Sequence, residues 1–185
     1  MAELKIVITG CMGAGKTTAI NSISDTPLIA TDVGTTDEAR LEKDTTTVAM
    51  DYGTLTIDDD RVVYLYGTPG QERFAHMWEI LAEGALGVVI LLNHRREDPL
   101  ADLEIYLENF QQAIANSTAV IGITHVDESG DTDTTAVTPY YDYMARHGLD
   151  YPIFPIDARA GAQVRVMIEA MAAMIQLDEE TDEAV

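Results

Sequence analysis

The sequence is poor in the features that mark secreted and membrane proteins. Cys11 is the only cysteine among 185 residues, so no internal disulfide can form, which agrees with a reducing cytosol. No apolar run reaches the roughly 18 residues that a transmembrane helix needs. The first residues run straight into a strand pattern instead of a secretory signal, and the last ones hold no cysteine for a lipid anchor. We therefore expect a cytoplasmic protein with no direct membrane anchor.

Positive charge is also scarce. Lysine and arginine together number 11 against 32 aspartates and glutamates, which gives a formal net charge of −21. Such a surface repels nucleic acid and anionic membranes, so we expect neither as a partner. Solubility is the ordinary explanation of the charge. A salt-rich cytoplasm and a basic docking partner are the alternatives.

What the chain does contain is an alternation of strand-like and helix-like segments. This predicts an α/β fold with a mostly parallel sheet covered by helices on both faces. Segments 47–57 and 61–66 are typical of a hairpin, which would place one antiparallel strand at an edge. The six predicted strands are 3–9, 47–57, 61–66, 85–92, 119–124 and 153–156, and the predicted helices are 16–24, 71–83, 100–115, 138–147 and 164–177.

The remaining segments are assigned by their turn residues and charge. Residues 25–46 are expected to form a long loop, and such loops in a compact domain are usually functional or mobile. Pro139 is expected in the first turn of its helix, with Gly148 just past the end. We place one domain over 1–177 and an acidic, flexible tail over 178–185.

The strongest motif lies between the first strand and the first helix. Gly10 to Thr17 matches G-x-x-x-x-G-K-[ST] at every fixed position. The glycines let consecutive backbone N–H groups turn toward phosphates, and the helix N-terminus adds its dipole. We expect Lys16 to reach the β- and γ-phosphates and the Thr17 hydroxyl to bind Mg²⁺. An ordinary turn with chance glycines is the alternative. The expected nucleotide-binding residues are Gly10, Met12, Gly13, Ala14, Gly15, Lys16, Thr17 and Thr18.

A second motif follows a strand about fifty residues later. Gly67 to Phe74, read as GTPGQERF, resembles the second switch of Ras-superfamily GTPases, which usually reads DTAGQERF in Rab-like members. The resemblance implies that the Gly70 N–H contacts the γ-phosphate and that Gln71 orients the attacking water. An exposed residue at a helix start is the alternative for Gln71. Gly67 departs from the family because it replaces the aspartate of the Mg²⁺ shell. Asp32 and Asp37 are candidate substitutes, and spacing does not choose between them.

Two later segments resemble the base-binding motifs of the same superfamily. Thr124 to Asp127 (THVD) stands where those proteins carry N/T-K-x-D, at the end of a buried strand. A carboxylate at Asp127 would accept hydrogen bonds from guanine and leave adenine without a match; the alternative is that it only starts an acidic loop. His125 replaces the usual lysine and would still pack over the base and brace the phosphate loop. Ala158 and Arg159, in the sequence DAR, resemble the weaker SAK motif.

The first switch is expected at the end of the long loop. One threonine there should bind Mg²⁺ and the γ-phosphate. The resemblance favours Thr47, with Thr46 as the alternate and a β-prone threonine run as the other interpretation. Arg40 and Arg73 are candidates for the cation that stabilises the transferring phosphate, although a solvated surface arginine is the more ordinary reading of each. Met12 would obstruct an incoming arginine or water, which predicts slow intrinsic turnover.

These motifs occur in the order found in small Ras-like GTPases, over roughly residues 4–177. The chain resembles a bacterial group of these proteins related to the MglA type. The resemblance implies a three-layer Ras-like P-loop NTPase fold, GTP or GDP with Mg²⁺ as ligands, and a Roadblock-type protein partner that recognises the switches. Two other functions stay open. One is a GTP-binding module without hydrolysis, favoured by Gly67 and Met12, and the other is an ATP-using P-loop enzyme such as a small-molecule kinase.

Overall fold

The computed structural model describes residues 3–27, 29–33, 48–58, 61–126 and 133–183. Across these residues, seven strands form one sheet in the order β2-β3-β4-β1-β5-β6-β7. No helix in this part of the chain is both long and apolar enough to cross a bilayer. The strands are β1 (Glu3–Gly10), β2 (Ile29–Val33), β3 (Val48–Asp58), β4 (Arg61–Gly67), β5 (Gly87–Asn93), β6 (Thr118–Thr124) and β7 (Ile153–Pro155).

The predicted fold class is confirmed, because β4, β1, β5, β6 and β7 run parallel and β3 runs antiparallel to its neighbours. The strand count differs from the prediction. Strand β2 lies within the segment expected as a loop, and it pairs with β3 at the edge of the sheet. Its short sequence, IATDV, has a weak strand pattern. It therefore depends on hydrogen bonds from β3 that no local pattern announces.

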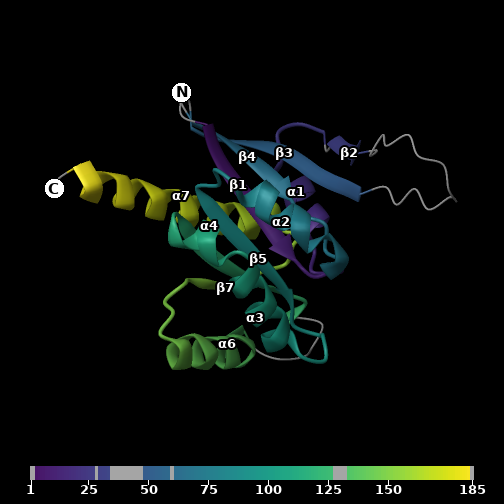
Figure 1. The fold of residues 1–185 in the computed structure, drawn as a ribbon, viewed down its shortest axis with the longest axis vertical. Helices are drawn as coiled ribbons and strands as arrows, with labels where there is room; N and C mark the ends of the chain where they lie inside the picture. The colour runs from purple at the N-terminus through teal and green to yellow at the C-terminus, as the bar shows by residue number, and fades with distance from the viewer. Residues whose placement is uncertain (1–2, 28, 34–47, 59–60, 127–132, 184–185) are drawn as a thin grey trace, which may run out of the picture.

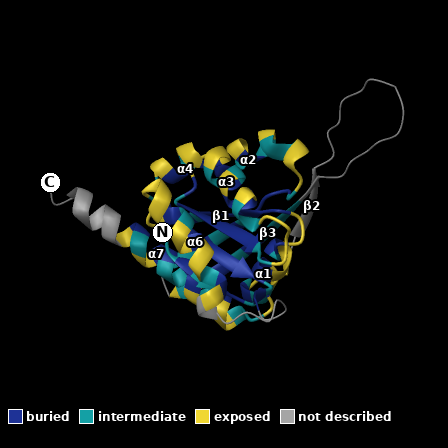
Figure 2. Ribbon diagram, turned by 90° about the horizontal axis from the view of Figure 1, so that it is seen from below, coloured by how far each residue is buried: buried dark blue, intermediate teal, exposed yellow. Residues whose placement is uncertain are grey.

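Helices cover both faces of the sheet (Figure 1). Helices α1 (Lys16–Ile23) and α7 (Gly161–Glu183) pack against each other on one face. On the other face, α2 (Ala75–Ala82), α3 (Pro99–Asn109) and α4 (Gln111–Ala115) lie over the strands, and α6 (Asp133–His147) packs against α3 and β7. Figure 2 shows the buried strands between these layers of partly exposed helices. This arrangement gives the predicted three layers.

Several helix boundaries differ from the predictions. The helix expected over 71–83 is a short 3₁₀ turn, η1 (Glu72–Phe74), followed by α2, and the one expected over 100–115 is divided at Phe110 into α3 and α4. Helix α6 starts at Asp133, so Pro139 lies inside it and not in its first turn. Proline costs a helix one hydrogen bond. The buried side chains of Ala136 and Tyr140 on either side of it explain why the helix continues through that position.

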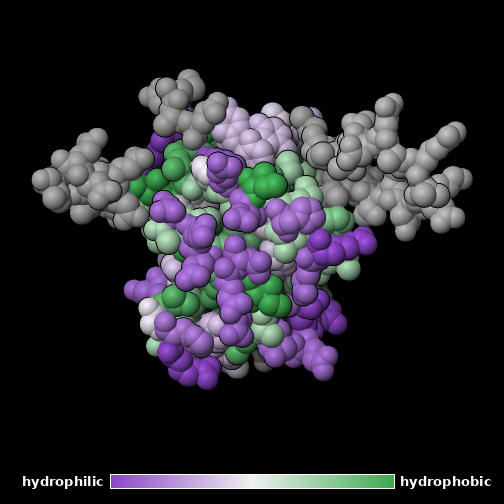
Figure 3. Space-filling model, viewed as in Figure 1, coloured by the Kyte–Doolittle hydropathy of each residue, from purple (hydrophilic) through white to green (hydrophobic). Residues whose placement is uncertain are grey.

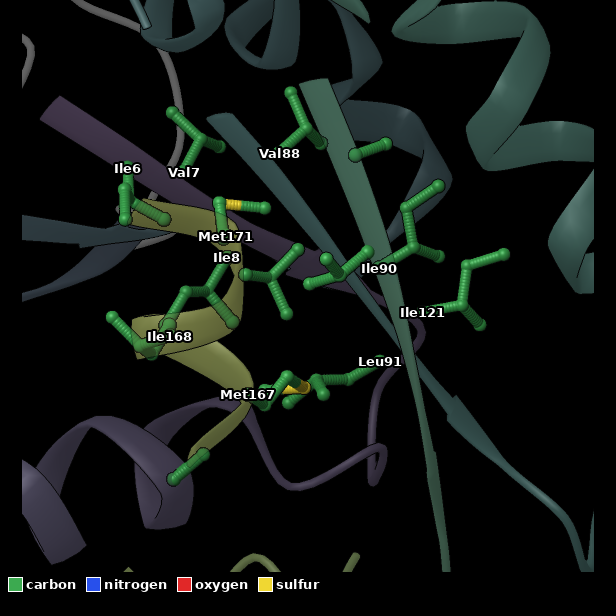
Figure 4. Close-up of a cluster of buried hydrophobic side chains, with 14 of the residues drawn as sticks. Ile6, Val7, Ile8, Val88, Ile90, Leu91, Ile121, Met167, Ile168 and Met171 are labelled. Carbon is green, nitrogen blue, oxygen red and sulfur yellow. The ribbon is translucent and has the colours of Figure 1, made fainter. Parts of the chain in front are cut away.

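The core beneath the site is formed by the central strands and α7. Ile6 and Ile8 of β1 and Leu91 of β5 pack toward Met167 and Met171 of α7 (Figure 4). All five side chains are fully buried. Helix α7 runs to Glu183, beyond the predicted end at Leu177, while the division into domain and tail at 177 stays a prediction. Hydrophilic side chains dominate the face shown in Figure 3, with only small apolar areas between them.

Candidate nucleotide site

The predicted phosphate loop joins β1 to α1 through two glycines that no other residue replaces easily. Gly10 has a φ of 142°, and a Cβ added there would lie 2.1 Å from the Leu91 carbonyl oxygen of the neighbouring strand. Gly15 precedes α1 in the left-handed region, with a φ of 92°. Residues with a Cβ rarely adopt these backbone angles, whereas glycine adopts them without strain. The loop therefore turns tightly at the carboxyl end of β1, and the N-terminus of α1 faces the space beyond that edge of the sheet.

Lys16 is held across this loop. Its side chain is only 8% exposed, and its Nζ donates hydrogen bonds to the carbonyl oxygens of Gly10 at 2.7 Å and Cys11 at 2.9 Å. Burial lowers the pKa of the Lys16 ammonium and raises the pKa of the Cys11 thiol. The ammonium group is thus fixed beside the loop, where its charge faces little competing water.

A cavity of about 430 Å³ lies in front of the phosphate loop. It brings the first two predicted motifs together, since both the loop and the second switch contribute to its wall. Four lining residues were not among the predicted site residues: Asp51 of β3, and Thr68, Pro69 and Phe74 of the second-switch motif. The lining residues are Met12, Gly13, Gly15, Lys16, Thr17, Thr18, Asp51, Thr68, Pro69, Gly70, Gln71 and Phe74.

The second switch packs directly on the phosphate loop. A Cβ added to Gly70 would lie 2.7 Å from the Lys16 Nζ and 2.8 Å from the Met12 backbone nitrogen. Gln71 is exposed and precedes η1, at the mouth of the cavity. The guanidinium of Arg73 lies over the Phe74 ring, 4.8 Å from its centre, and Arg73 does not line the cavity. The predicted neighbourhood of Gly70 and Gln71 is present, whereas the candidate arginine faces elsewhere.

The start of this switch is anchored by residues that sequence reasoning missed. The indole N–H of Trp78, the only tryptophan of the chain, donates to the Pro69 carbonyl at 2.7 Å. Trp78 is 1% exposed and packs on Tyr106, with ring centres 4.9 Å apart. The Thr68 hydroxyl shares a 2.8 Å hydrogen bond with the hydroxyl of Thr9 in β1. A tryptophan within helical apolar spacing was the available signal, but it indicated only a core residue.

Residues at the end of β6 contact the opposite side of the loop. The Thr124 hydroxyl is 3.1 Å from both the Ala14 and the Leu92 carbonyl oxygens, and Thr124 is buried. His125 has a φ of 62°, and its Nε2 lies 3.2 Å from the Gly13 carbonyl oxygen. His125 therefore contacts the phosphate loop, and its predicted packing over a base stays a prediction. Asp127, the predicted guanine-binding residue, lies outside the described residues.

The weaker predicted motif also approaches the loop. A Cβ added to Gly15 would lie 2.9 Å from the Ala158 Cβ, so Ala158 stands directly beside the start of α1. The Arg159 guanidinium pairs with the Asp157 carboxylate at 2.8 Å. Its hydrogen bonds lower the pKa of Asp157. Ala158 is thus brought to the site, while the Arg159 side chain is engaged with its neighbour.

The predicted metal side is described only in part. The Thr17 hydroxyl donates a 2.5 Å hydrogen bond to Asp51 Oδ2. Thr47, its alternate Thr46, Asp37 and Arg40 lie outside the described residues, and for Asp32 in β2 only the backbone is described. The signal that would have found Asp51 is the register of the hairpin, since Asp51 pairs with Gly67 across β3 and β4.

Comparison with known structures supports the fold. The crystal structure of the G domain of the T. maritima FeoB iron transporter superposes with a TM-score of 0.64 at 18% sequence identity, covering 93% of this chain and 98% of that one. At this level of identity the likeness concerns the fold alone.

Comparison of sequences supplies a relative and a family. The chain is 33% identical over 103 residues to the uncharacterized protein MJ1339 of Methanocaldococcus jannaschii. That alignment covers 56% of this chain and 59% of the relative's length. The family described as conserved hypothetical ATP binding protein matches residues 27–183. This range begins after the phosphate loop and includes the second-switch motif and both predicted base-binding motifs. The chain belongs to this family of conserved hypothetical ATP binding proteins.

Proposed function

We propose that this protein binds GTP and GDP with Mg²⁺ and slowly hydrolyses GTP as a molecular switch. The observation that carries the proposal is the close approach of Gly70 to both Lys16 and Met12 at one cavity, where an added Cβ would have no room. A phosphate loop alone would serve many nucleotide enzymes. A second glycine segment packed on the lysine of that loop is what lets a protein sense a terminal phosphate.

The binding step follows from the groups at the loop. Backbone N–H groups of the loop and the N-terminus of α1 attract the phosphates, and the Lys16 ammonium adds a full charge. The Thr17 hydroxyl, exposed at the first turn of α1, is an oxygen ligand suited to Mg²⁺. The metal would neutralise charge that develops on the phosphates during transfer.

The choice of guanine rests on the order of motifs. Thr124 and His125 are placed against the loop at the carboxyl end of β6, and Ala158 stands beside Gly15. In a parallel sheet, ligands bind outside this edge. Asp127 is next but one to His125 in the sequence, and its carboxylate would select guanine over adenine by hydrogen bonding.

Hydrolysis would need a water oriented by Gln71. The water oxygen attacks the γ-phosphorus, the bond from that phosphorus to the bridging oxygen breaks, and GDP and phosphate leave. Among the described residues that line the cavity, Lys16 is the only cation, and Met12 stands 68% exposed at the rim. These features support slow turnover without a partner that contributes a further positive charge.

Two alternatives have specific support. Gly67 and Met12 favour a GTP-binding module without hydrolysis, because one removes the usual metal carboxylate and the other crowds the loop. ATP as the nucleotide is favoured by the name of the family, which describes its members as ATP binding.

The protein partners follow from the switch motif. The sequence GTPGQERF at Gly67 to Phe74 supports a relationship of this protein to the MglA-related group of small Ras-like GTPases. A Roadblock-type partner that contacts the switches in the cytoplasm is the corresponding proposal.

A nucleotide competition assay tests the choice of base. Fluorescent GDP bound to the purified protein is displaced with unlabelled GTP, GDP or ATP. We expect GTP and GDP to compete at least about 100-fold better than ATP, because a buried acid left unpaired costs several kcal/mol. Displacement by ATP at equal concentration would show an adenine nucleotide site.

Single-turnover hydrolysis of GTP tests the switch. We expect Gln71→Leu to slow phosphate release at least about tenfold without weakening GTP binding. Gln112→Leu, at an exposed position of α4 and outside the lining of this cavity, is the matched control and should behave as the wild type. Tight GTP binding with no phosphate release by the wild type would favour the non-hydrolysing module.

A further inference from the structure

The structure shows what fills the space of the carboxylate that Gly67 lacks. Asp51 of β3 lies directly opposite Gly67 of β4 in the antiparallel register. A Cβ added to Gly67 would lie 2.9 Å from the Asp51 Cβ and 3.2 Å from its Oδ2, and 3.0 Å from Ile20 Cδ1. Position 67 is therefore too crowded for any side chain, and the crowding atoms include a carboxylate oxygen.

This carboxylate is oriented toward the phosphate loop. Asp51 Oδ2 accepts a 2.5 Å hydrogen bond from the Thr17 hydroxyl, and Asp51 lines the same cavity as Lys16 and Gly70. A hydroxyl has one donor and two acceptor lone pairs. Donation to Asp51 thus leaves the lone pairs of Thr17 available to a cation.

The group that fits this donor set is a magnesium ion that arrives with a nucleotide. Mg²⁺ takes oxygen ligands, and at phosphate sites the protein supplies only one or two of them, while phosphates and waters supply the rest. Within the described residues, no group of three or more His, Cys, Asp or Glu side chains forms a metal cage. One hydroxyl and one carboxylate beside the phosphate loop are the contribution expected of such a site.

We propose that Asp51 supplies from β3 the magnesium-site carboxylate that Gly67 does not supply from β4. The inference rests on the proposed function, because it assigns the metal of that nucleotide site. It replaces Asp32 and Asp37 as the substitute acid. It also explains the glycine, since a side chain at position 67 would displace Asp51 from the place beside Thr17.

Metal affinity of the full-length protein tests the assignment. Mn²⁺ replaces Mg²⁺ as a probe, and its binding to the GDP complex is titrated by electron paramagnetic resonance for the wild type, Asp51→Asn and Asp58→Asn. The control removes the same charge from the exposed end of the same strand. GDP affinity is measured separately in EDTA, so that nucleotide binding is scored without the metal.

We expect Asp51→Asn to weaken Mn²⁺ binding about 10- to 100-fold and Asp58→Asn to leave it unchanged. GDP affinity in EDTA should stay within about twofold of the wild type in both variants, because neither carboxylate is assigned a contact with the nucleotide. Equal Mn²⁺ affinity in all three proteins, with GDP bound, would overturn this inference alone. Failure of the wild type to bind GDP would overturn the proposed function and this inference together.

A variant that moves the carboxylate from position 51 to position 67 tests the assignment even if the Asp51 single variants are poorly folded. Asp51→Gly combined with Gly67→Asp moves the carboxylate to β4 and empties the space on β3. We expect the double variant to bind Mn²⁺ at least about tenfold more tightly than Asp51→Gly alone. A folded double variant, checked by circular dichroism, that binds Mn²⁺ no better than Asp51→Gly would contradict the shared position of the two carboxylates.

Discussion

On one side of the phosphate loop, which we call the base side, Thr124 and His125 reach the loop from β6, and Ala158 lies next to Gly15. On the other, the metal side, Asp51 reaches Thr17 from β3. The base side uses the carboxyl ends of parallel strands, which meet at one edge of the sheet whatever the details of pairing. The metal side depends on a hairpin register, where a slip of one residue turns every side chain to the other face.

This contrast teaches where a motif can be trusted. A short motif at the end of a parallel strand is placed by that strand, and Thr124, His125 and Ala158 all lie beside the phosphate loop. Their contacts with a nucleotide base stay predictions. The neighbours of an acid on an antiparallel strand cannot be predicted from the acid alone, because its partner on the next strand is set by the bulge and turn between the two strands. The comparison also separates base recognition from metal binding, since only changes on the metal side should alter the effect of Mg²⁺ on nucleotide binding.

The largest expected effect comes from a change in the phosphate loop itself, which both sides contact. Lys16→Ala removes the ammonium that bridges the Gly10 and Cys11 carbonyls. We expect GDP affinity to fall at least about 100-fold, because charge-assisted bonds to phosphate are lost together with the loop brace. Lys5→Ala is the control, because Lys5 lies within β1 and its Nζ donates to the exposed Glu83 carbonyl. Unchanged titration of fluorescent GDP by Lys16→Ala would remove the phosphate loop from the site.

A second change addresses the base side alone. Thr124→Val keeps the shape but loses the hydroxyl near the Ala14 and Leu92 carbonyls. We expect unfolding in urea to become easier by about 1–3 kcal/mol, since buried carbonyls lose their partner. GDP affinity should fall by the same factor in Mg²⁺ and in EDTA. Thr118→Val, at the other end of β6, is the control for nucleotide affinity. A loss seen only in Mg²⁺ would erase the distinction between the two sides.

A third change separates backbone from side chain at the base side. His125 has a φ of 62°, which suits glycine better than any residue with a Cβ. We expect His125→Ala to be less stable than His125→Gly by about 1 kcal/mol in chemical denaturation, because alanine keeps the left-handed cost. Both variants lose the contact with Gly13 and should bind GDP equally weakly. Equal stability of the two variants would show that this backbone angle carries no cost.

The smallest expected effect concerns pH. Hydrogen bonds from Arg159 lower the folded-state pKa of Asp157, so the pair stabilises the fold above the unfolded pKa, about 3.9. This stabilisation is lost as the pH falls through the lower, folded-state pKa. We expect Arg159→Ala to reduce the melting temperature at pH 7 by no more than about 2 °C, as for other exposed pairs. The difference from the wild type should vanish in melts at pH values below both pKa values, and a constant difference would assign it to packing.

Much of the fold was accessible to sequence reasoning because its signals are local. The phosphate loop needs glycines at Gly10 and Gly15 for backbone reasons that hold in any context, and the apolar runs of β1, β5 and β6 are typical of central parallel strands. Strand β2 was missed because an edge strand takes its hydrogen bonds from a neighbour. The position of Pro139 was wrong because packing around Ala136 and Tyr140 outweighs the local cost of proline.

The sequence by itself determined the alternation of strands and helices, the phosphate loop and the GTPGQERF motif that follows it, since each depends on residues adjacent along the chain. The tertiary structure alone decided which acid stands beside Thr17. Asp58 pairs with Arg61 at the turn, and this register carried along the hairpin would set Tyr52 opposite Gly67. An irregularity between Thr56 and Asp58 shifts the pairing by one residue and sets Asp51 there instead. Because side chains alternate between the faces of a strand, that single shift turns a carboxylate toward the phosphate loop.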